Sequence, residues 1–317
     1  VVEPLDDYFT ATGTDLSDYF DGMVDSVSSL DGTIYGLPFG ISSGICIYNE
    51  TVLEEIGLPF PETWEEFKVW CKDVHEATGK VAFGFPYDFN YMNNFFINVT
   101  GLDPLGDGTK SVLDDPKIME FVYDMKELVD AGYCSWVGTS INAAQDDQLA
   151  AFVLGELIAY TDTSTGIVKA IDSADFEVNT AVGITGTDQP PITTSSGAAL
   201  VIYAGNDQAV KNAAFQFATY LTSAENIAQW AVDTCMYPVR KSVLESGALE
   251  ALYEDYPGSR NVFDNAANVV AKNKSPAMQS CMEVVVDALG QILKGDADIE
   301  STWATMKEEV DYMLADT

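Results

Sequence analysis

The segment from Asp31 to Asn49 constrains the fold of this chain more than any other part of it. Residues 33–37 are β-prone, residues 38–44 are rich in glycine, proline and serine, and residues 45–48 are apolar again. The pattern predicts a strand, an extended break and a second strand, since the break is too open for a tight hairpin. Chains pass between two lobes through such segments, and ligand sites are common where lobes meet.

The length of the chain and the alternation of its elements predict two α/β lobes. At 317 residues, the chain is longer than a single hydrophobic core usually serves. Strand-like stretches alternate with helical ones, such as the capped helix that begins at Thr63 and two C-terminal helices at 276–293 and 299–314. A linker at 183–196 leads into an expected buried strand at 197–203. Such alternation is typical of lobes built on largely parallel sheets.

The charge of the chain excludes nucleic acid and anionic lipid as partners. Lys and Arg number 15 against 50 Asp and Glu, which gives a formal net charge of -35. Polyanions are bound through clusters of Lys and Arg and are repelled by such an acidic surface. The acidic residues are dispersed, which favours a role in solubility, and no calcium-loop or cofactor motif is present. No cofactor or metal is therefore expected.

The five cysteines are widely spaced along the chain. They are Cys46, Cys71, Cys134, Cys235 and Cys281. No C-x-x-C pair occurs and the number is odd, so neither a zinc site nor a disulfide framework is predicted. Cys46 falls in an apolar strand and Cys71 in a helix, where free cysteine packs as a small hydrophobic residue.

The residues needed for catalysis are scarce. His75 is the only histidine, and its charged neighbours place it on the polar side of a helix. A solvated helix residue is a poor general base, and no second histidine is available for a Ser-His or Cys-His pair. The chain is therefore not expected to be an enzyme. A pair of carboxylates acting on a polysaccharide stays open as the alternative, although no pattern singles out two of the 50 acidic residues.

Loops after the expected strands gather the side chains that sugars and polyols require. Hydroxyl and amide groups bind ligand hydroxyls, and aromatic rings pack on the apolar faces of a sugar. Ligands of α/β folds bind beyond the carboxyl ends of strands, where these loops lie. Loop capping explains each serine or threonine taken singly, so the prediction rests on the set. The candidate ligand-binding residues are Ser42, Ser43, Tyr91, Asn93, Asp162, Thr163, Ser164, Thr165, Ser196, Gly197, Met236 and Tyr237.

The motifs resemble those of the extracellular solute-binding proteins of ABC importers, the family of the maltose- and glycerol-3-phosphate-type receptors. Members carry a G-x-x-Y-x-L-P strand, a hinge, a Y-N strand and a G-L-x-x-P-x-T-W-x-E helix start. The matching residues are Gly32, Tyr35, Leu37, Pro38, Tyr48, Asn49, Gly57, Leu58, Pro61, Thr63, Trp64 and Glu66. The resemblance implies an α/β, two-lobed, periplasmic-binding-protein-like (type II) clamshell with hinge crossovers.

The resemblance also implies how the chain divides between the lobes. Residues 1–40 and 198–236 are expected in the first lobe, and residues 45–194 and 240–317 in the second. Residues 39–44, 194–197 and 236–240 are the expected hinge or crossover segments. The family's usual strand–helix–strand opening has no counterpart in these residues, so the first lobe is expected to be N-terminally incomplete.

Three of the candidate residues match ligand positions of the glycerol-3-phosphate-type receptors, namely Ser43, Ser164 and Gly197. Two positions depart from that pattern. Met236 replaces the turn tyrosine, and Met282, next to Glu283, falls near the arginine expected to grip the phosphate. Met282 and Glu283 complete the set of candidate ligand-binding residues. Because a phosphate is held by a bidentate arginine, its loss favours a neutral or cationic ligand.

The resemblance therefore implies an extracytoplasmic receptor of an ABC importer. It is expected to capture a small neutral carbohydrate or polyol by lobe closure and to deliver it to a permease in the membrane. The expected location is the periplasm, or the surface of a Gram-positive bacterium as a lipoprotein, with the export signal removed. Besides the enzyme, a fragment or degenerate receptor that folds without binding stays open, and exposed apolar surface on the first lobe is its marker.

Overall fold

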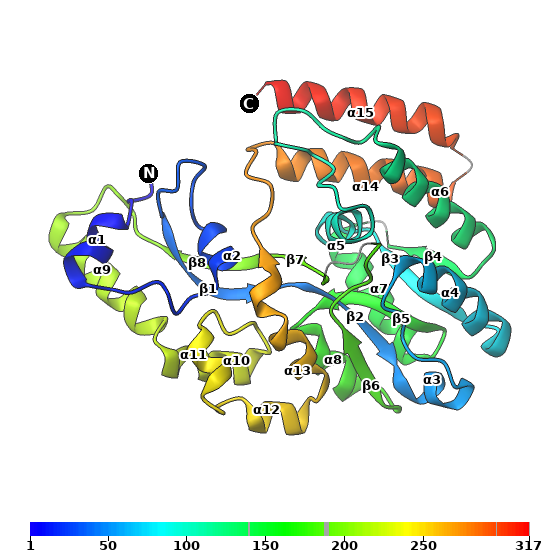
Figure 1. Ribbon diagram of the computed structural model, residues 1–317, viewed down its shortest axis with the longest axis horizontal. Helices are drawn as coiled ribbons and strands as arrows, with labels where there is room; N and C mark the ends of the chain where they lie inside the picture. Colours follow the sequence, from blue (N-terminus) through cyan, green and yellow to red (C-terminus); the bar gives the residue numbers. More distant parts are fainter. Residues whose placement is uncertain (139, 187–189, 296, 317) are drawn as a thin grey trace. The chain divides into compact units, whose positions relative to one another are not determined.

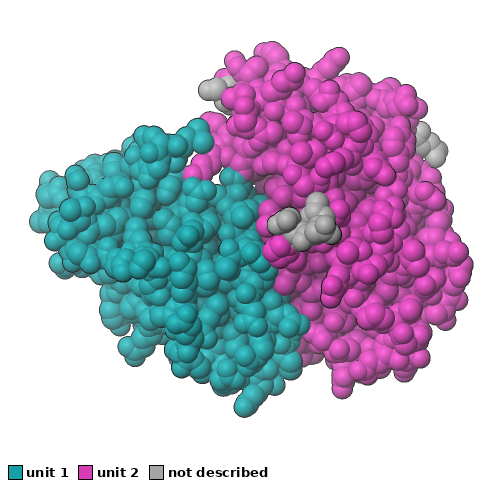
Figure 2. Space-filling model, viewed as in Figure 1, with its two compact units in different colours: residues 1–43, 163–168, 193–272 teal, residues 44–162, 169–192, 273–317 magenta. Residues whose placement is uncertain are grey.

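The computed structural model describes residues 1–138, 140–186, 190–295 and 297–316, so residues 187–189 of the expected linker lie outside the described residues. The chain forms two compact units, coloured separately in Figure 2. Unit 1 comprises residues 1–43, 163–168 and 193–272, and unit 2 comprises residues 44–162, 169–192 and 273–317. The chain thus passes between the units several times, as the sequence predicts for two lobes.

Unit 2 is built on a five-stranded mixed sheet. Its strands in spatial order are β4 (Cys134–Val137), β3 (Val81–Pro86), β5 (Leu157–Thr163), β2 (Gly44–Asn49) and β6 (Val178–Ala181). β3 pairs in parallel with both β4 and β5, and β2 pairs antiparallel with β6. Parallel neighbours require crossover connections, which explains the alternation of strands and helices along this part of the chain.

Helices contribute most of the large core of unit 2. The helices of this part of the chain are α3 (Glu50–Ile56), α4 (Trp64–Thr78), α5 (Phe89–Phe95) with the π-helical turn η1 (Phe96–Thr100), α6 (Pro116–Asp130), α7 (Ile141–Val153), α8 (Gly166–Ser173), α14 (Met278–Lys294) and α15 (Ile299–Ala315). One of them, α8, begins in unit 1. The predicted capping box at Thr63 and both C-terminal helices are confirmed. α14 and α15 pack side by side (Figure 1). No described helix has the length and apolar character needed to span a membrane.

Unit 1 contains two small sheets and mostly short helices. β1 (Gly36–Ser42) pairs antiparallel with β8 (Ser196–Val201), and β7 (Thr193–Thr194) pairs in parallel with β9 (Val269–Val270). The helices are α1 (Asp6–Thr12), α2 (Asp21–Asp25), α9 (Gln208–Leu221), α10 (Ala224–Thr234), α11 (Lys241–Glu245), α12 (Glu250–Asp255), α13 (Gly258–Asp264) and the 3-10 turn η2 (Ala266–Asn268).

The predicted break between the first two strands is much shorter than expected. β1 runs through Ser42 and β2 starts at Gly44, so Ser43 alone separates them, and the boundary between the units follows it. The register of β1 on β8 shifts between Pro38 and Gly40. A proline cannot donate to the ladder and is tolerated in a strand at such an irregularity, so it does not end β1.

The strand predicted at 197–203 is wrong in its burial. β8 is partly exposed along its length, and Val201 has 57% of its surface exposed. Among the described residues β1 is the only strand paired with β8, so the second edge of β8 lacks a strand neighbour. The apolar side chain of Val201 therefore lies at the surface of unit 1, because no other described part of that unit covers this end of β8.

The division of the chain differs from the expected one in two segments. Residues 163–168, predicted for the second lobe, lie in unit 1, and so do residues 240–272. Contacts within unit 1 explain the placement of residues 240–272. The Arg240 guanidinium donates to Asp18 at 3.0 Å and stacks over the ring of Tyr19 at 4.2 Å. The rings of Tyr237 and Phe263 lie 5.5 Å apart.

Candidate functional site

The candidate ligand-binding residues fall in both units, and each unit contributes a group of its own. Those in unit 1 are Ser42, Ser43, Thr163, Ser164, Thr165, Ser196, Gly197, Met236 and Tyr237. Those in unit 2 are Tyr91, Asn93, Asp162, Met282 and Glu283.

The end of β1 brings several of the unit 1 residues together. Ser42 lies opposite Ser196 in the β1–β8 ladder. The Ser43 hydroxyl donates to the Thr194 carbonyl at 3.4 Å, and the Ser164 amide donates to the Ser43 carbonyl at 3.2 Å. Three segments that are distant in the sequence therefore meet around Ser43.

Gly197 is required by the close approach of β1 and β8. Its φ of +124° lies in a region that side chains rarely adopt. A Cβ atom at this position would lie 1.9 Å from the Gly40 carbonyl oxygen. The glycine therefore lets the backbone of β8 pass close to β1 beside Ser196.

Two buried hydroxyls of this group have no hydrogen-bond partner among the described residues. They belong to Ser164 and Tyr237, which are 0% and 1% exposed. Burial raises the pKa of Tyr237, so its hydroxyl stays neutral. The Tyr237 amide donates to the Ile41 carbonyl at 2.8 Å, which holds this turn against β1. Buried polar groups are normally paired, so these hydroxyls are available to a water or a ligand.

An aromatic group next to β1 was not identified from the sequence. The rings of Phe39 and Trp230 lie 4.8 Å apart, and the Trp230 indole donates to the Met236 sulfur at 3.3 Å. All three side chains are half-buried. A Cβ atom on Gly40 would lie 3.1 Å from the Met236 sulfur, so this group packs directly on β1. In the sequence Trp230 resembles a core residue of a helix, and only the pairing with Phe39 identifies it.

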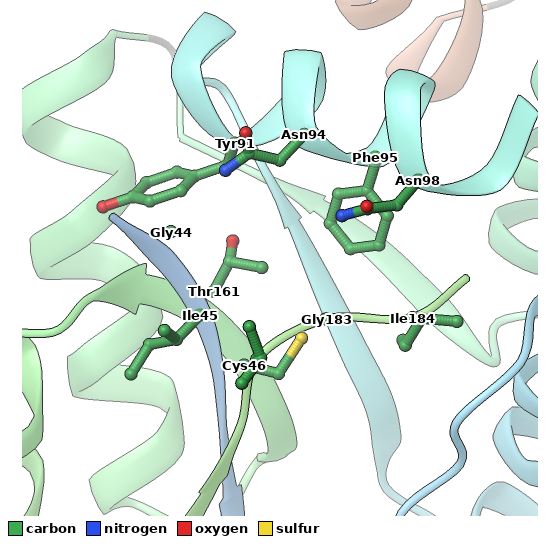
Figure 3. Close-up of a pocket in the computed structure, with 11 residues that line it drawn as sticks. Gly44, Ile45, Cys46, Tyr91, Asn94, Phe95, Asn98, Thr161, Gly183 and Ile184 are labelled. Atoms are coloured by element: carbon green, nitrogen blue, oxygen red, sulfur yellow. The ribbon is translucent and has the colours of Figure 1, made fainter. Parts of the chain in front are cut away.

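In unit 2, Tyr91 and Asn93, which are expected in a loop after a strand, lie in helix α5. Asp88 caps the helix by accepting from the Asn90 amide at 2.8 Å, and buried apolar residues follow at helical spacing. Tyr91, Asn94 and Asn98 then lie on one face (Figure 3). Asn93, predicted for the site, is buried but does not line this pocket. Helical spacing from Tyr91 would have found Asn94 and Asn98.

The pocket under this face is small. It is lined by Gly44, Ile45, Cys46, Tyr91, Asn94, Phe95, Asn98, Thr161, Val182, Gly183 and Ile184 (Figure 3). It encloses about 20 Å³, which is room for one water molecule, whereas pockets for small ligands measure about 300–1,000 Å³. The buried Thr161 hydroxyl has no partner among the described residues and would bind such a water. This pocket is not by itself a sugar site.

Tyr91 and Asp162 lie close enough to interact electrostatically. Burial raises the pKa of Tyr91 well above its usual value, and the carboxylates of Asp162 and Asp88 add to the shift. The Tyr91 hydroxyl accepts a hydrogen bond from Gln145 at 3.1 Å, a residue that the sequence did not single out. The buried Tyr160 hydroxyl has no partner among the described residues, and burial and Asp162 raise its pKa as well. The tyrosines therefore stay neutral and can donate to a ligand oxygen.

The remaining candidates are placed less favourably. Met282 is fully buried in the core of unit 2, and the neighbouring Glu283 is exposed and accepts from Gln279 at 3.0 Å. The Thr163 and Thr165 hydroxyls bond to one another at 2.8 Å.

The only histidine, His75, is half-buried rather than solvated, and its Nδ1 lies 2.9 Å from the Lys80 carbonyl. In the described part of the chain no three His, Cys, Asp or Glu residues are grouped so as to hold a metal ion.

Several known proteins are similar to this chain in sequence. The sn-glycerol-3-phosphate-binding periplasmic protein UgpB of Rhizobium meliloti is 26% identical over 261 residues, which are 77% of this chain and 58% of that protein. An arabinooligosaccharide-binding protein of Halalkalibacterium halodurans is 30% identical over 101 residues, 30% of this chain and 22% of that protein. The chain thus matches a little over half the length of UgpB.

Solved structures show the same fold. UgpB from Mycobacterium tuberculosis in complex with glycerophosphocholine has a TM-score of 0.81 at 22% identity, over 99% of this chain and 79% of that one. The cyclic α-maltosyl-1,6-maltose binding protein from Arthrobacter globiformis has a TM-score of 0.82 at 21% identity, over 100% and 81%. The predicted two-lobed periplasmic-binding-protein-like α/β fold is confirmed. The family model of bacterial extracellular solute-binding proteins matches residues 1–260, and the chain belongs to this family.

Proposed function

We propose that this chain is the ligand-capturing receptor of an ABC importer and that it binds a small neutral carbohydrate or polyol. The observation that carries the proposal is the half-buried ring pair of Phe39 and Trp230. Phe39 lies in β1, the strand that ends at Ser42 next to Ser43. Carbohydrates need such an apolar ring surface beside hydroxyl partners. The family membership supports binding rather than turnover.

Three ion pairs of unit 1 support a neutral ligand. Lys211 pairs with Glu3, Arg240 with Asp18, and Arg260 with Glu250. The Arg240 guanidinium also donates to the Tyr19 hydroxyl and to the Thr222 carbonyl, so its donors are largely used. A phosphate or carboxylate bound by one of these side chains would have to break its ion pair, whereas a neutral ligand would not.

The remaining parts of the proposal follow from the family. A receptor of this kind works outside the cytoplasm, in the periplasm or attached to the cell surface as a lipoprotein, and passes its ligand to a membrane permease. We also propose that the two lobes close on the ligand. The candidate residues of both units, including those of unit 2 around Tyr91 and Asp162, are proposed to bind it.

The proposal is tested by replacing Trp230. Trp230→Ala should weaken binding of a neutral sugar or polyol by about 5- to 60-fold, because ring stacking and the buried area are together worth about 1–2.5 kcal/mol. Phe217→Ala is the matched control, since Phe217 is an exposed aromatic residue of the same unit. Isothermal titration measures both variants. Equal affinities for Trp230→Ala and the unchanged chain would contradict the proposed site.

A chain that folds without binding a transport ligand is the second candidate. The observation that favours it is the exposed apolar surface of unit 1, where Val201, Phe217 and Tyr220 are 57%, 61% and 64% exposed. It predicts that no sugar or polyol stabilises a sample that unfolds cooperatively.

A further inference from the structure

Two cysteines that are distant in the sequence are in contact inside unit 2. Cys71 lies in α4 and Cys134 is the first residue of β4, 63 positions further along the chain. Their sulfur atoms lie 3.5 Å apart. The side chains are 0% and 3% exposed. No other two cysteine sulfurs in the described ranges are this close.

The fold brings these two residues together through β3. Phe67 of α4 packs on this strand, with its ring 5.1 Å from that of Phe83. Phe83 in turn lies beside Cys134 in the parallel β3–β4 ladder. Cys71 follows Phe67 by one helical turn on the same buried face, so it meets the neighbouring strand at Cys134.

We propose that Cys71 and Cys134 form an intrachain disulfide when the chain folds under oxidising conditions. Both backbones are already held by regular hydrogen bonding, α4 in its helix and β4 beside β3. A disulfide needs sulfurs about 2.05 Å apart, so the two sulfurs approach by about 1.5 Å through side-chain rotation. The bond would tie the helical layer to the edge strand of the sheet.

The oxidation is a thiol–disulfide exchange with a small disulfide such as oxidised glutathione. The thiolate of one cysteine attacks the reagent, forms a mixed disulfide and releases one thiol. The thiolate of the second cysteine then attacks the mixed disulfide and releases the other thiol. The two cysteines lose two protons and two electrons, and the reagent is reduced to two thiols.

The timing of the reaction follows from the burial of the pair. Burial and the contact with Cys134 raise the pKa of the Cys71 thiol well above its usual value, so the folded protein holds little thiolate at this site. The exchange should therefore take place during folding, before the core of unit 2 closes around the two cysteines. An oxidant added to the folded protein should react slowly.

The test is a disulfide map of the full chain after refolding. The unfolded, reduced chain is refolded in a mixture of oxidised and reduced glutathione, alkylated, digested and analysed by mass spectrometry, with a sample refolded in excess reductant as reference. We expect one crosslinked peptide pair that contains Cys71 and Cys134, lighter by two hydrogens than the two reduced peptides. Alkylation of both residues in every molecule, or a crosslink to any other cysteine, would overturn the proposal.

Variants separate this bond from nonspecific oxidation. Cys71→Ser and Cys134→Ser should each abolish the crosslink and make the melting temperature insensitive to reductant. Cys281→Ser is the matched control, since Cys281 is equally buried in the same unit and contacts the Val310 carbonyl rather than a cysteine. It should keep both the crosslink and the drop in melting temperature on reduction. If the serine variants fail to fold, the disulfide map of the unchanged chain still tests whether Cys71 and Cys134 are crosslinked.

Discussion

At the scale of single residues, two glycines with a positive φ have different roles. One ends a helix, and the other is required by the pairing of two strands. Gly13 and Gly197 both have a positive φ. A Cβ atom on Gly13 would have no atom within 4 Å of it, whereas one on Gly197 would overlap the Gly40 carbonyl. The first glycine relieves local strain only, and the second also makes room for a neighbouring strand.

We therefore expect Gly197→Ala to destabilise the protein by more than about 2 kcal/mol, since the strained φ and a backbone clash add together. Gly13→Ala should cost only about 1 kcal/mol, because it carries the φ penalty alone. Urea unfolding of both variants measures the difference. Equal losses would mean that β1 and β8 separate easily and that the close approach is unimportant.

The residues of the candidate site show what a sequence can and cannot predict. Ser43 and Ser164 are both predicted from the sequence, and the structure brings them within one hydrogen bond of each other. Trp230 and Gln145 were missed because each lies on a helix that is otherwise unremarkable in the sequence. Their roles depend on partners far along the chain, Phe39 and Tyr91, and no local pattern carries that information.

At the scale of elements, the long amphipathic helices were predictable and the irregular ones were not. α4, α14 and α15 have clear apolar stripes, and the capping box marks the start of α4. The sequence of α5 resembles a loop because its aromatic and amide residues have modest helix propensity. Burial against the core overrides that preference, as tertiary packing often does.

Helix α9 has an unusual exposed face. Val210, Ala213, Phe217 and Tyr220 recur at helical spacing, and all four are exposed. The opposite face buries Phe215 and Ala218. A surface helix normally has one apolar stripe, so the second stripe leaves apolar area in contact with water.

We expect the double variant Phe217→Ser, Tyr220→Ser to reduce binding of a hydrophobic dye such as ANS severalfold. Its free energy of unfolding should change by less than about 0.5 kcal/mol, as is usual for exposed positions. The control is Tyr312→Ser, an exposed aromatic residue on α15 in unit 2. Dye binding that falls equally in the control would show that the α9 stripe is not the main exposed apolar surface.

At the scale of the whole molecule, the family and the two-unit organisation followed from motif order, while the exact division of the chain did not. Residues 240–272 pack in unit 1 through Arg240 and Phe263, contacts that no spacing rule predicts. According to their names, two relatives of this chain bind solutes as different as sn-glycerol 3-phosphate and arabinooligosaccharides. The ligand of this chain therefore depends on its own side chains.

The central claim is that this chain captures a neutral carbohydrate or polyol, and a thermal-shift panel on the unmodified protein tests it most directly. The panel contains neutral mono- and oligosaccharides and polyols, with sn-glycerol 3-phosphate and amino acids for comparison. A ligand present at about 100 times its dissociation constant adds about 2.7 kcal/mol to the stability, a clear rise in melting temperature. We predict that at least one neutral compound produces this shift and that sn-glycerol 3-phosphate does not. Stabilisation by the phosphate alone, or by no compound in a cooperatively folded sample, would contradict the claim.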